Sequence, residues 1–248
     1  MRDLTLRFGG NIALNGLSVE LYEGELLSIV GPNGAGKTSL FNCISGVYRP
    51  ERGDVLLEGR SVIGLPPYQL ARLGVSRTFQ SVELFSMSVV QNILVGRQVK
   101  MKSGLLRASI FAGFTAREER HQRRRAEEIL DFLEIGRYRH DDVEHLPLGV
   151  QKRVEMGRAL ALEPRLLLLD EPTAGMNRAE KEDIARIILR IRRELGISLA
   201  LIEHDMRFVM DLSDRVCVMN FGEELATGAP KDVANNEQVI RAYLGDHA

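Results

Sequence analysis

A glycine-rich loop directly after an apolar run constrains this chain more than any other segment. The apolar run spans 26–30, and the loop reads Gly31-Pro32-Asn33-Gly34-Ala35-Gly36-Lys37-Thr38. Small residues at this spacing let successive backbone N–H groups turn inward around a polyphosphate, and the lysine adds a positive charge. A helix that begins here directs the positive end of its dipole toward the same anion. The pattern predicts a phosphate-binding loop between a strand and a helix.

The ligand predicted for this loop is ATP with Mg²⁺. The predicted nucleotide-binding residues of the loop are Gly31, Pro32, Asn33, Gly34, Ala35, Gly36, Lys37, Thr38 and Ser39. The Thr38 hydroxyl is placed to bind the Mg²⁺ that accompanies ATP. A purely structural glycine turn is the alternative, but the complete pattern between strand and helix disfavours it.

Length and charge limit the other possibilities. The 248 residues suit a single domain, 1–248, with one large core, and the net charge of −1 disfavours nucleic acid as the main partner. Cys43 and Cys217 form no disulfide framework and are expected to be buried thiols. Because no secretory pattern or membrane-spanning apolar stretch is present, a cytoplasmic location is expected.

Apolar periodicity predicts an α/β fold with a mostly parallel core sheet and an antiparallel β edge. The edge is predicted from strands over 4–8 and 17–21 around Gly9-Gly10. Core strands are predicted over 26–30, 75–79, 166–170 and 197–202, followed by a hairpin of 215–219 with 224–226 and a helix over 236–244. Asn177 and Glu180 have the spacing of a helix cap, and Gly196 ends that helix.

Residues 86–157 are predicted to form an inserted helical subdomain. Ala126, Ile129, Leu130 and Leu133 lie at helical spacing and form one apolar stripe. The arginine run 123–125 is flanked by glutamates, so a solvated face of mixed charge is favoured over a basic binding patch.

Polar residues follow three predicted core strands. Asp170 and Glu171 end the strand over 166–170, and we assign metal binding to Asp170 and proton transfer from water to Glu171. A helix cap is the alternative, which Pro172 disfavours because it indicates a sharp exit from the strand. His204 follows the next strand, and Gln80 closes the strand over 75–79, where its amide can contact magnesium or water.

A second polar cluster is a weaker candidate for metal binding. It contains His140, Asp141, Asp142, Glu144 and His145. These residues crowd a polar stretch without a defined ligand spacing, so a metal site is disfavoured there.

Taken together, these motifs resemble the ATP-binding subunits of ABC transporters over nearly the whole chain. The resemblance implies a P-loop ATPase with Glu171, His204 and Gln80 as catalytic residues, and an aromatic residue, here Phe8, that stacks on adenine. A phenylalanine in the core remains the alternative for Phe8. It also implies that Gly149 contacts the ATP held by an opposite subunit.

More narrowly, the chain is similar to the branched-chain amino acid importers of that family. The similarity rests on 7–10, the insert over 95–125, 174–177, 201–206 and 239–245. It implies a second ATPase subunit, different or identical, integral membrane permeases, and indirectly a periplasmic or extracellular binding protein. The implied location is the cytoplasmic face of the inner membrane, reached through the permeases.

Two departures from the family pattern are visible. The signature segment reads Leu146-Pro147-Leu148-Gly149-Val150, so its usual serine hydroxyl and glutamine amide are absent, and slower turnover is expected at the site that it completes. The amino end before the first strand is shorter than usual in the family.

A nucleotide-dependent gating or regulatory module with little hydrolysis is the alternative function, and an ATPase of DNA repair or translation is disfavoured.

Overall fold

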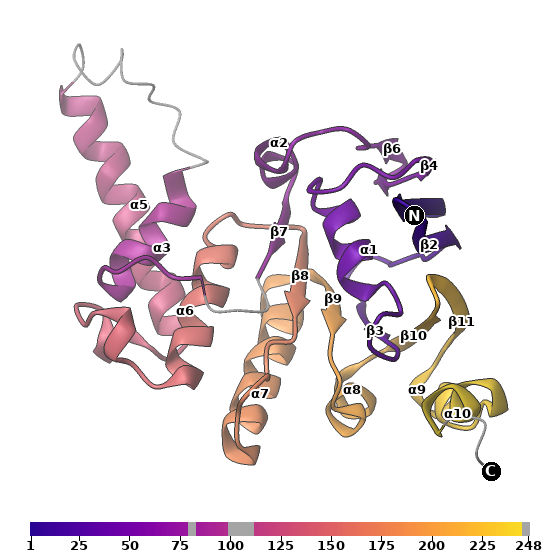
Figure 1. The fold of residues 1–248 in the computed structure, drawn as a ribbon. Coiled ribbons are helices and arrows are strands. Elements are labelled where there is room, and N and C mark those ends of the chain that lie inside the picture. The colour runs from indigo at the N-terminus through magenta and orange to yellow at the C-terminus, as the bar shows by residue number, and fades with distance from the viewer. Residues whose placement is uncertain (79–82, 99–111, 245–248) are drawn as a thin grey trace.

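A mixed sheet lies at the centre of the fold (Figure 1). The structure, a computed structural model, describes residues 1–78, 83–98 and 112–244, without the side chains of 112–118 and 244. Among these residues the sheet has six strands in the order β11-β10-β3-β9-β8-β7, and β11 runs antiparallel to β10. The strands are β3 (Leu26–Val30), β7 (Val75–Arg77), β8 (Leu166–Asp170), β9 (Ser198–Ile202), β10 (Arg215–Asn220) and β11 (Glu223–Gly228). The predicted α/β fold with a mostly parallel core is confirmed.

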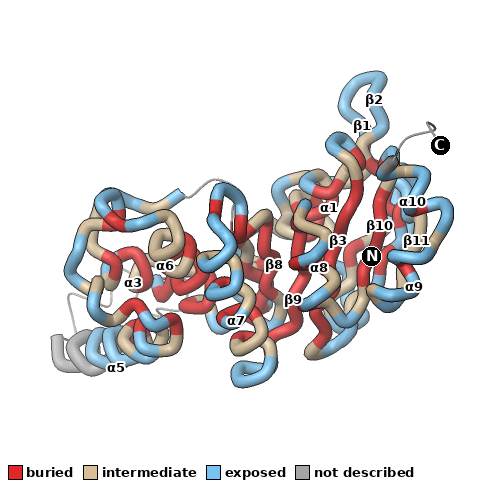
Figure 2. Tube along the Cα trace, turned by 90° about the horizontal axis from the view of Figure 1, so that it is seen from below, coloured by how far each residue is buried: buried red, intermediate tan, exposed pale blue. Residues whose placement is uncertain are grey.

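Both faces of this sheet are buried, because successive side chains of a strand point to opposite sides. Leu167 and Leu169 of β8 lie in an apolar cluster with α6 (Leu148–Leu160) and α7 (Arg178–Leu195), whereas Leu168 lies in a second cluster with α1 (Lys37–Ile44). Figure 2 shows β3, β8, β9 and β10 as buried segments inside the molecule. The run of leucines in β8 is therefore covered from both sides, as its lack of polar residues predicted.

An antiparallel sheet with the order β2-β1-β4 lies beside the core, as expected. Its strands are β1 (Arg2–Phe8), β2 (Asn11–Leu17) and β4 (Arg52–Asp54), while β5 (Leu56–Leu57) pairs with β6 (Arg60–Ser61). The prediction of a strand over 17–21 was wrong, because β2 begins directly after the Gly9-Gly10 turn and ends at Leu17. Only Leu14 and Leu17 of β2 are buried, so the strand lacks the apolar alternation used for prediction.

Helices dominate the described residues between 88 and 162. They are α3 (Val89–Arg97), α5 (Ala112–Phe132), α6 and two short 3-10 helices, η2 (Gly136–Tyr138) and η3 (Val143–His145). In Figure 1, α3, α5 and α6 lie together beyond the β7 end of the sheet. Ala126 and Leu130 of α5 and Leu133, directly after its last residue, are fully buried, and Ile129 is partly buried against the same cluster, which agrees with the predicted apolar stripe. The assignment of 86–157 as one inserted subdomain stays a prediction.

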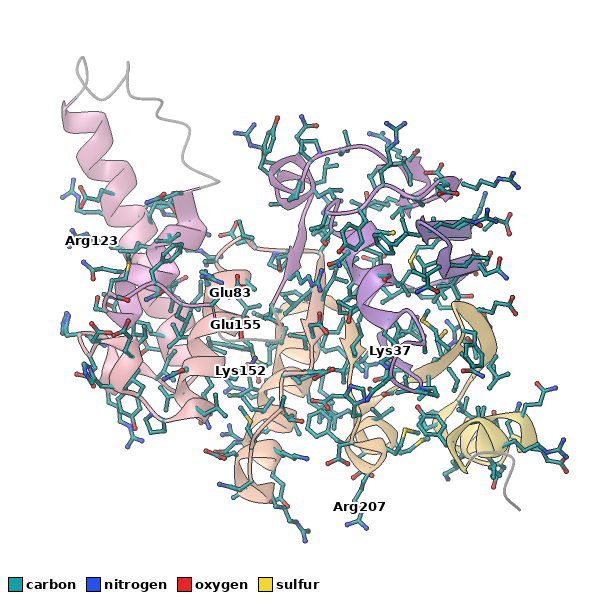
Figure 3. The ribbon with its side chains drawn as sticks, viewed as in Figure 1. Lys37, Glu83, Arg123, Lys152, Glu155 and Arg207 are labelled. Atoms are coloured by element: carbon teal, nitrogen blue, oxygen red, sulfur yellow. The ribbon has the colours of Figure 1, made fainter. Side chains whose placement is uncertain are left out.

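The arginine run of α5 lies in a network of ion pairs. Arg123, labelled in Figure 3, lies 2.8 Å from Glu119, and Arg124 and Arg125 lie 3.2 Å and 2.6 Å from Glu128. These arginines are exposed or half-exposed, so the run forms the predicted solvated face of mixed charge.

The remaining helices lie at the ends of the sheet strands. They are α2 (Pro67–Arg72), α8 (Met206–Leu212), α9 (Pro230–Ala234) and α10 (Glu237–Leu244). Asn177 and Glu180 cap α7 reciprocally, and Gly196 ends that helix, as predicted.

Cys43 and Cys217 are buried free thiols, as expected from the sequence. The described part of the chain contains no helix with the length and apolarity needed to cross a membrane.

Candidate functional site

The carboxyl ends of four neighbouring parallel strands meet at one edge of the central sheet. The register places Ile202 of β9 beside Ile29 of β3 on one side and beside Asp170 of β8 on the other. In β7, Arg77 is paired with Leu168 of β8, so this strand ends at the same edge. The segments that follow these strands therefore leave the sheet side by side.

The glycine-rich loop is held between β10 and β2 by two close approaches. Gly31 has a φ of +153°, and a Cβ atom there would lie 2.2 Å from the Met219 carbonyl oxygen of β10. Gly36 has a φ of +99°, and its Cβ would lie 2.4 Å from the Ala13 carbonyl oxygen of β2. Both positions require glycine for conformation and for space. Helix α1 begins at the next residue, Lys37, which gives the strand, loop and helix that the sequence pattern predicted.

Lys37 is 6% exposed, and its ammonium group bonds to the loop itself. Its Nζ donates to the carbonyl oxygens of Gly31 at 2.7 Å and Pro32 at 2.9 Å (Figure 3 labels Lys37). Burial lowers the pKa of Lys37, while the carboxylates of Glu171 and Asp170 act to raise it. This lysine therefore lies within electrostatic reach of Asp170, predicted to bind the metal, and of Glu171, predicted to act in catalysis. An anion in the loop would replace the two carbonyl oxygens as its partner.

Asp170 is almost completely buried at the end of β8, and only one of its two carboxylate oxygens accepts a hydrogen bond from the described residues. Oδ2 lies 2.6 Å from Arg77 Nη2, and Arg77 Nη1 also donates to Asn42 Oδ1 of α1 at 2.6 Å. Oδ1 is buried and has no hydrogen-bond partner among the residues that the structure describes. A buried carboxylate oxygen without a donor is a suitable ligand for a hard cation such as Mg²⁺.

Glu171 and His204 are in direct contact at the same edge. His204 Nε2 lies 2.7 Å from Glu171 Oε1, although the two residues come from segments after different strands. Glu171 has a φ of +47°, which is unusual outside glycine, and its backbone N–H donates to the Ile202 carbonyl oxygen at 2.9 Å. The structure therefore brings together the acid and the imidazole that were predicted separately.

Glu203 positions the segments that carry this pair. Its buried carboxylate accepts hydrogen bonds from the Thr173 N–H at 2.9 Å, the Thr173 hydroxyl at 2.5 Å and the His204 N–H at 3.0 Å. The segment after Glu171 and the segment of His204 are thus held by one side chain.

Phe8 lies at the turn between β1 and β2 and is 47% exposed. Its ring meets the Tyr48 ring edge to face, with centroids 5.1 Å apart. A phenylalanine in the core, the alternative considered from sequence, does not match this exposure. Phe8 therefore offers an exposed aromatic ring supported by the partly buried Tyr48, and its stacking on adenine stays a prediction.

Gly149 lies away from the glycine-rich loop. It is in the first turn of α6, and β7, β8 and β9 separate α6 from α1 in Figure 1. The side chain of Glu180 lies beside it, since a Cβ atom on Gly149 would be 3.5 Å from Glu180 Oε1. Pro147, the residue before α6, provides no side-chain cap. Gly149 is therefore separated from Lys37 and Glu171, and its contact with ATP held by an opposite subunit stays a prediction.

Two further sequence predictions concern Gln80 and the polar cluster at 140–145. Gln80, predicted to contact magnesium and the attacking water, lies outside the described residues. In the cluster at 140–145, Asp142 accepts a hydrogen bond from the Glu144 N–H at the start of η3. Among the residues that the structure describes, no group of three or more His, Cys, Asp or Glu side chains is arranged to hold a metal ion.

Sequence analysis missed Arg77 and Glu203 as parts of the site. Glu203 stands directly before His204 at the end of a buried strand, so its position was a usable signal. Arg77 had no such signal, because its partners Asn42 and Asp170 lie 35 and 93 residues away along the chain.

Family models match most of the chain. The ABC transporter model matches residues 14–174, and the model of the branched-chain amino acid ATP-binding cassette transporter matches residues 223–248. The chain is 42% identical to the high-affinity branched-chain amino acid transport ATP-binding protein LivG of Salmonella typhimurium, over 98% of this chain and 96% of that protein. It is 40% identical to BraF of Pseudomonas aeruginosa, which has the same description, with the same coverage.

Solved structures agree with the sequence matches. The ADP conformation of MJ1267, an ATP-binding cassette of an ABC transporter, superposes with a TM-score of 0.86 at 31% identity, covering 99% of this chain and 97% of that one. The dimeric structure of MJ0796, a bacterial ABC transporter cassette, has a TM-score of 0.77 at 25% identity, with 92% and 97% coverage. The chain belongs to the ABC transporter family and is an ATP-binding cassette of that family.

Proposed function

We propose that this cassette binds ATP with Mg²⁺ at the carboxyl edge of its sheet and hydrolyses it to energise uptake of branched-chain amino acids through separate permeases. The observation that carries the chemistry is the contact of Glu171 with His204 beside the loop of Lys37. The cargo is proposed from the relatives, because LivG and BraF are described as branched-chain amino acid transport proteins.

The phosphates of ATP would be held by the loop from Gly31 to Ser39. Backbone N–H groups of this loop and the amino end of α1 provide donors for the phosphate oxygens. Lys37 would leave the carbonyl oxygens of Gly31 and Pro32 and bind phosphate oxygens instead. Phe8, exposed and supported by Tyr48, would stack on the adenine.

Thr38 and Asp170 are the proposed magnesium ligands, together with Gln80. Thr38 is exposed in the first turn of α1, and Asp170 has a buried oxygen without a donor. The bound cation would supply positive charge next to the transferred phosphoryl group. Arg77 would keep the Asp170 carboxylate in place by holding its other oxygen.

Hydrolysis requires a group that takes a proton from water and a group that contacts the terminal phosphate. Glu171 would accept the proton, because its carboxylate is mostly shielded from solvent and lies at the edge near Lys37. His204 would orient Glu171 and contact the phosphate, since its side chain is half-exposed and its Nε2 touches the Glu171 carboxylate.

The proposed partners are a second cassette, different or identical, and integral membrane permeases. A dimer is supported by the dimeric cassette MJ0796, and permeases are supported by the transport function printed for the relatives. A periplasmic or extracellular binding protein would deliver the amino acid. The cassette would then lie at the cytoplasmic face of the inner membrane.

The test is transport by the assembled complex. The chain would be co-expressed with candidate permeases, purified with them from membranes and reconstituted in vesicles with the candidate binding protein outside. ATP enclosed with the cassette should drive uptake of labelled leucine. Lys37→Ala should abolish uptake, whereas Lys231→Ala, an exposed lysine of α9, should have no effect. Uptake that persists with Lys37→Ala, or a cassette that fails to retain ATP in the complex, would overturn the proposal.

A further inference from the structure

The turn between β10 and β11 lies between the glycine-rich loop and strand β2. In Figure 1, β2 lies beside both this hairpin and the start of α1, where the loop ends. The turn consists of Phe221 and Gly222, which have positive φ angles of +47° and +81°. Gly222 is buried, whereas Phe221 is 83% exposed. Gly222 is therefore the part of the turn that contacts the rest of the cassette.

The backbone of Gly222 bonds to the loop on one side and to β2 on the other. Its N–H donates to the Ala35 carbonyl oxygen of the loop at 3.0 Å, and its own carbonyl oxygen accepts from the Asn15 N–H of β2 at 2.9 Å. A side-chain bond lies next to this bridge, because Asn15 Nδ2 donates to Glu223 Oε1 at 2.5 Å. The turn thus links the glycine-rich loop to β2.

The contact with β2 leaves no room for a larger residue at position 222. A Cβ atom on Gly222 would lie 2.8 Å from the Ala13 carbonyl oxygen of β2. The same oxygen faces the loop, since a Cβ atom on Gly36 would lie 2.4 Å from it. A side chain at position 222 that displaces Ala13 therefore moves β2 relative to the loop.

Strand β2 is also attached to the proposed adenine site. Phe8, which would stack on adenine, is paired with Asn11 at the start of β2. The glycine-rich loop has bonds of its own that maintain its shape, because Lys37 Nζ donates to the carbonyl oxygens of Gly31 and Pro32. The separation between the Phe8 ring and the loop therefore depends on how β2 is attached to the loop.

We propose that Gly222 is a positioning residue that holds the Phe8 ring and the glycine-rich loop at the separation that ATP spans. ATP would contact both parts at once, so its affinity depends on their alignment, as for any ligand that joins two binding groups. Inorganic tripolyphosphate would contact the loop alone, and its affinity would not depend on the place of Phe8. This inference rests on the proposed function, since it concerns the same nucleotide.

The experiment measures the dissociation constants of ATP and of inorganic tripolyphosphate, both with Mg²⁺, for the full-length chain and for Gly222→Ala by titration calorimetry. The matched control is Gly59→Ala in the turn between β5 and β6. Gly59 has a φ of +78°, so alanine meets a similar backbone strain there, but its Cβ atom would meet none of the described atoms within 4 Å. Thermal unfolding without ligand shows whether each variant is folded at the assay temperature.

A second pair of variants tests the same link without changing a glycine. Asn15→Ala removes the side-chain bond to Glu223. Ser61→Ala is its control, because the Ser61 hydroxyl also forms an exposed bond in this part of the chain, to Asp54 Oδ1 at 2.6 Å. This pair decides the question where Gly222→Ala is not folded.

Gly222→Ala should raise the dissociation constant of ATP about fivefold or more, the loss expected when a base no longer stacks on an aromatic ring. The dissociation constant of tripolyphosphate should change less than about twofold in the same variant, because this ligand engages the loop alone. Asn15→Ala should weaken ATP binding about twofold or more, as is typical for the loss of one hydrogen bond. Gly59→Ala and Ser61→Ala should bind both ligands normally.

Unchanged ATP affinity in folded Gly222→Ala overturns the inference, and so does an equal weakening of ATP and tripolyphosphate. Where Gly222→Ala is unfolded, unchanged ATP affinity in Asn15→Ala overturns it. Selective weakening of ATP in Gly59→Ala also contradicts it, because backbone strain alone would then explain the effect. Failure of the unchanged protein to bind ATP, or to bind it more tightly than tripolyphosphate, would instead contradict the proposed function.

Discussion

His204 Nε2 lies 2.7 Å from Glu171 Oε1, so the imidazole and the carboxylate touch at the edge of the sheet. The Glu171 side chain is 15% exposed and that of His204 is 47% exposed. Glu171 also has a φ of +47°, a conformation that costs a residue other than glycine on the order of 1–3 kcal/mol. Glu171 is therefore strained and shielded from solvent, whereas the His204 imidazole is more accessible. This difference fits the proposed roles, in which Glu171 takes a proton from water and His204 contacts the phosphate.

Glu171→Gln is expected to stop turnover without preventing nucleotide binding. Glutamine keeps the size of the side chain but cannot accept the proton, and such catalysis contributes about 10²–10⁴ in rate. The kcat for ATP should therefore fall about 100-fold or more in the complex with the permeases, while the dissociation constant for ATP stays nearly unchanged. Glu182→Gln, in an exposed ion pair with Arg178, is the control and should keep full activity. A Glu171→Gln variant with nearly normal kcat would contradict the role of Glu171.

The first turn of α6 predicts unequal turnover at the two sites of a dimer with a different cassette. Pro147 offers no side-chain cap there, and Val150 has no polar side chain. Because a hydrogen bond to a charged group is worth about 1.5–3 kcal/mol, nucleotide opposite this α6 should be hydrolysed more slowly than nucleotide on this chain's own loop. The measurement compares ATPase activity after Glu171→Gln here and after the equivalent change in the partner. If only the change in the partner abolishes turnover, the predicted asymmetry is wrong.

Sequence analysis sufficed for the parts of the site that directly follow a strand. The loop from Gly31 to Thr38 and the acids Asp170 and Glu171 each stand at the end of a buried apolar run. Parallel strands of one sheet end at the same edge. The apolar runs therefore also predicted that the residues that follow them lie close together.

Contacts between distant segments were not predictable in this way. Arg77 reaches Asp170 through the packing of elements that are far apart along the chain. Strand β2 was misplaced for a different reason, because Asn11 and its other polar residues obscure the alternation that marks a half-buried strand.

Glu203→Gln should lower both stability and turnover. The carboxylate accepts from the Thr173 N–H, the Thr173 hydroxyl and the His204 N–H, and an amide has one oxygen to accept these bonds in place of two. Leaving a buried donor unpaired costs about 1–3 kcal/mol, so the free energy of unfolding in urea should fall by that amount. Glu224→Gln, an exposed residue of β11, should change it little. An unfolding free energy equal to that of the unchanged protein would show that Glu203 does not hold the two segments together.

The ion pair between Lys181 and Asp205 predicts a pH-dependent contribution to stability. Lys181 Nζ donates to Asp205 Oδ2 at 2.7 Å, and this bond, with the Phe208 N–H next in importance, holds the pKa of Asp205 below its usual value. Because the folded pKa is lower than the unfolded one, the contribution is present above the unfolded pKa of about 3.9 and is lost as pH falls through the folded pKa.

Asp205→Asn isolates this contribution, because asparagine also caps the start of α8 but carries no charge. Both side chains of the pair are about one third exposed, so solvent screening should limit the loss to less than about 1 kcal/mol at neutral pH. The difference in unfolding free energy between the two proteins should shrink as the pH is lowered below about 4. Urea unfolding across this range measures it, and a difference that stays constant with pH would rule out the ion pair as its source.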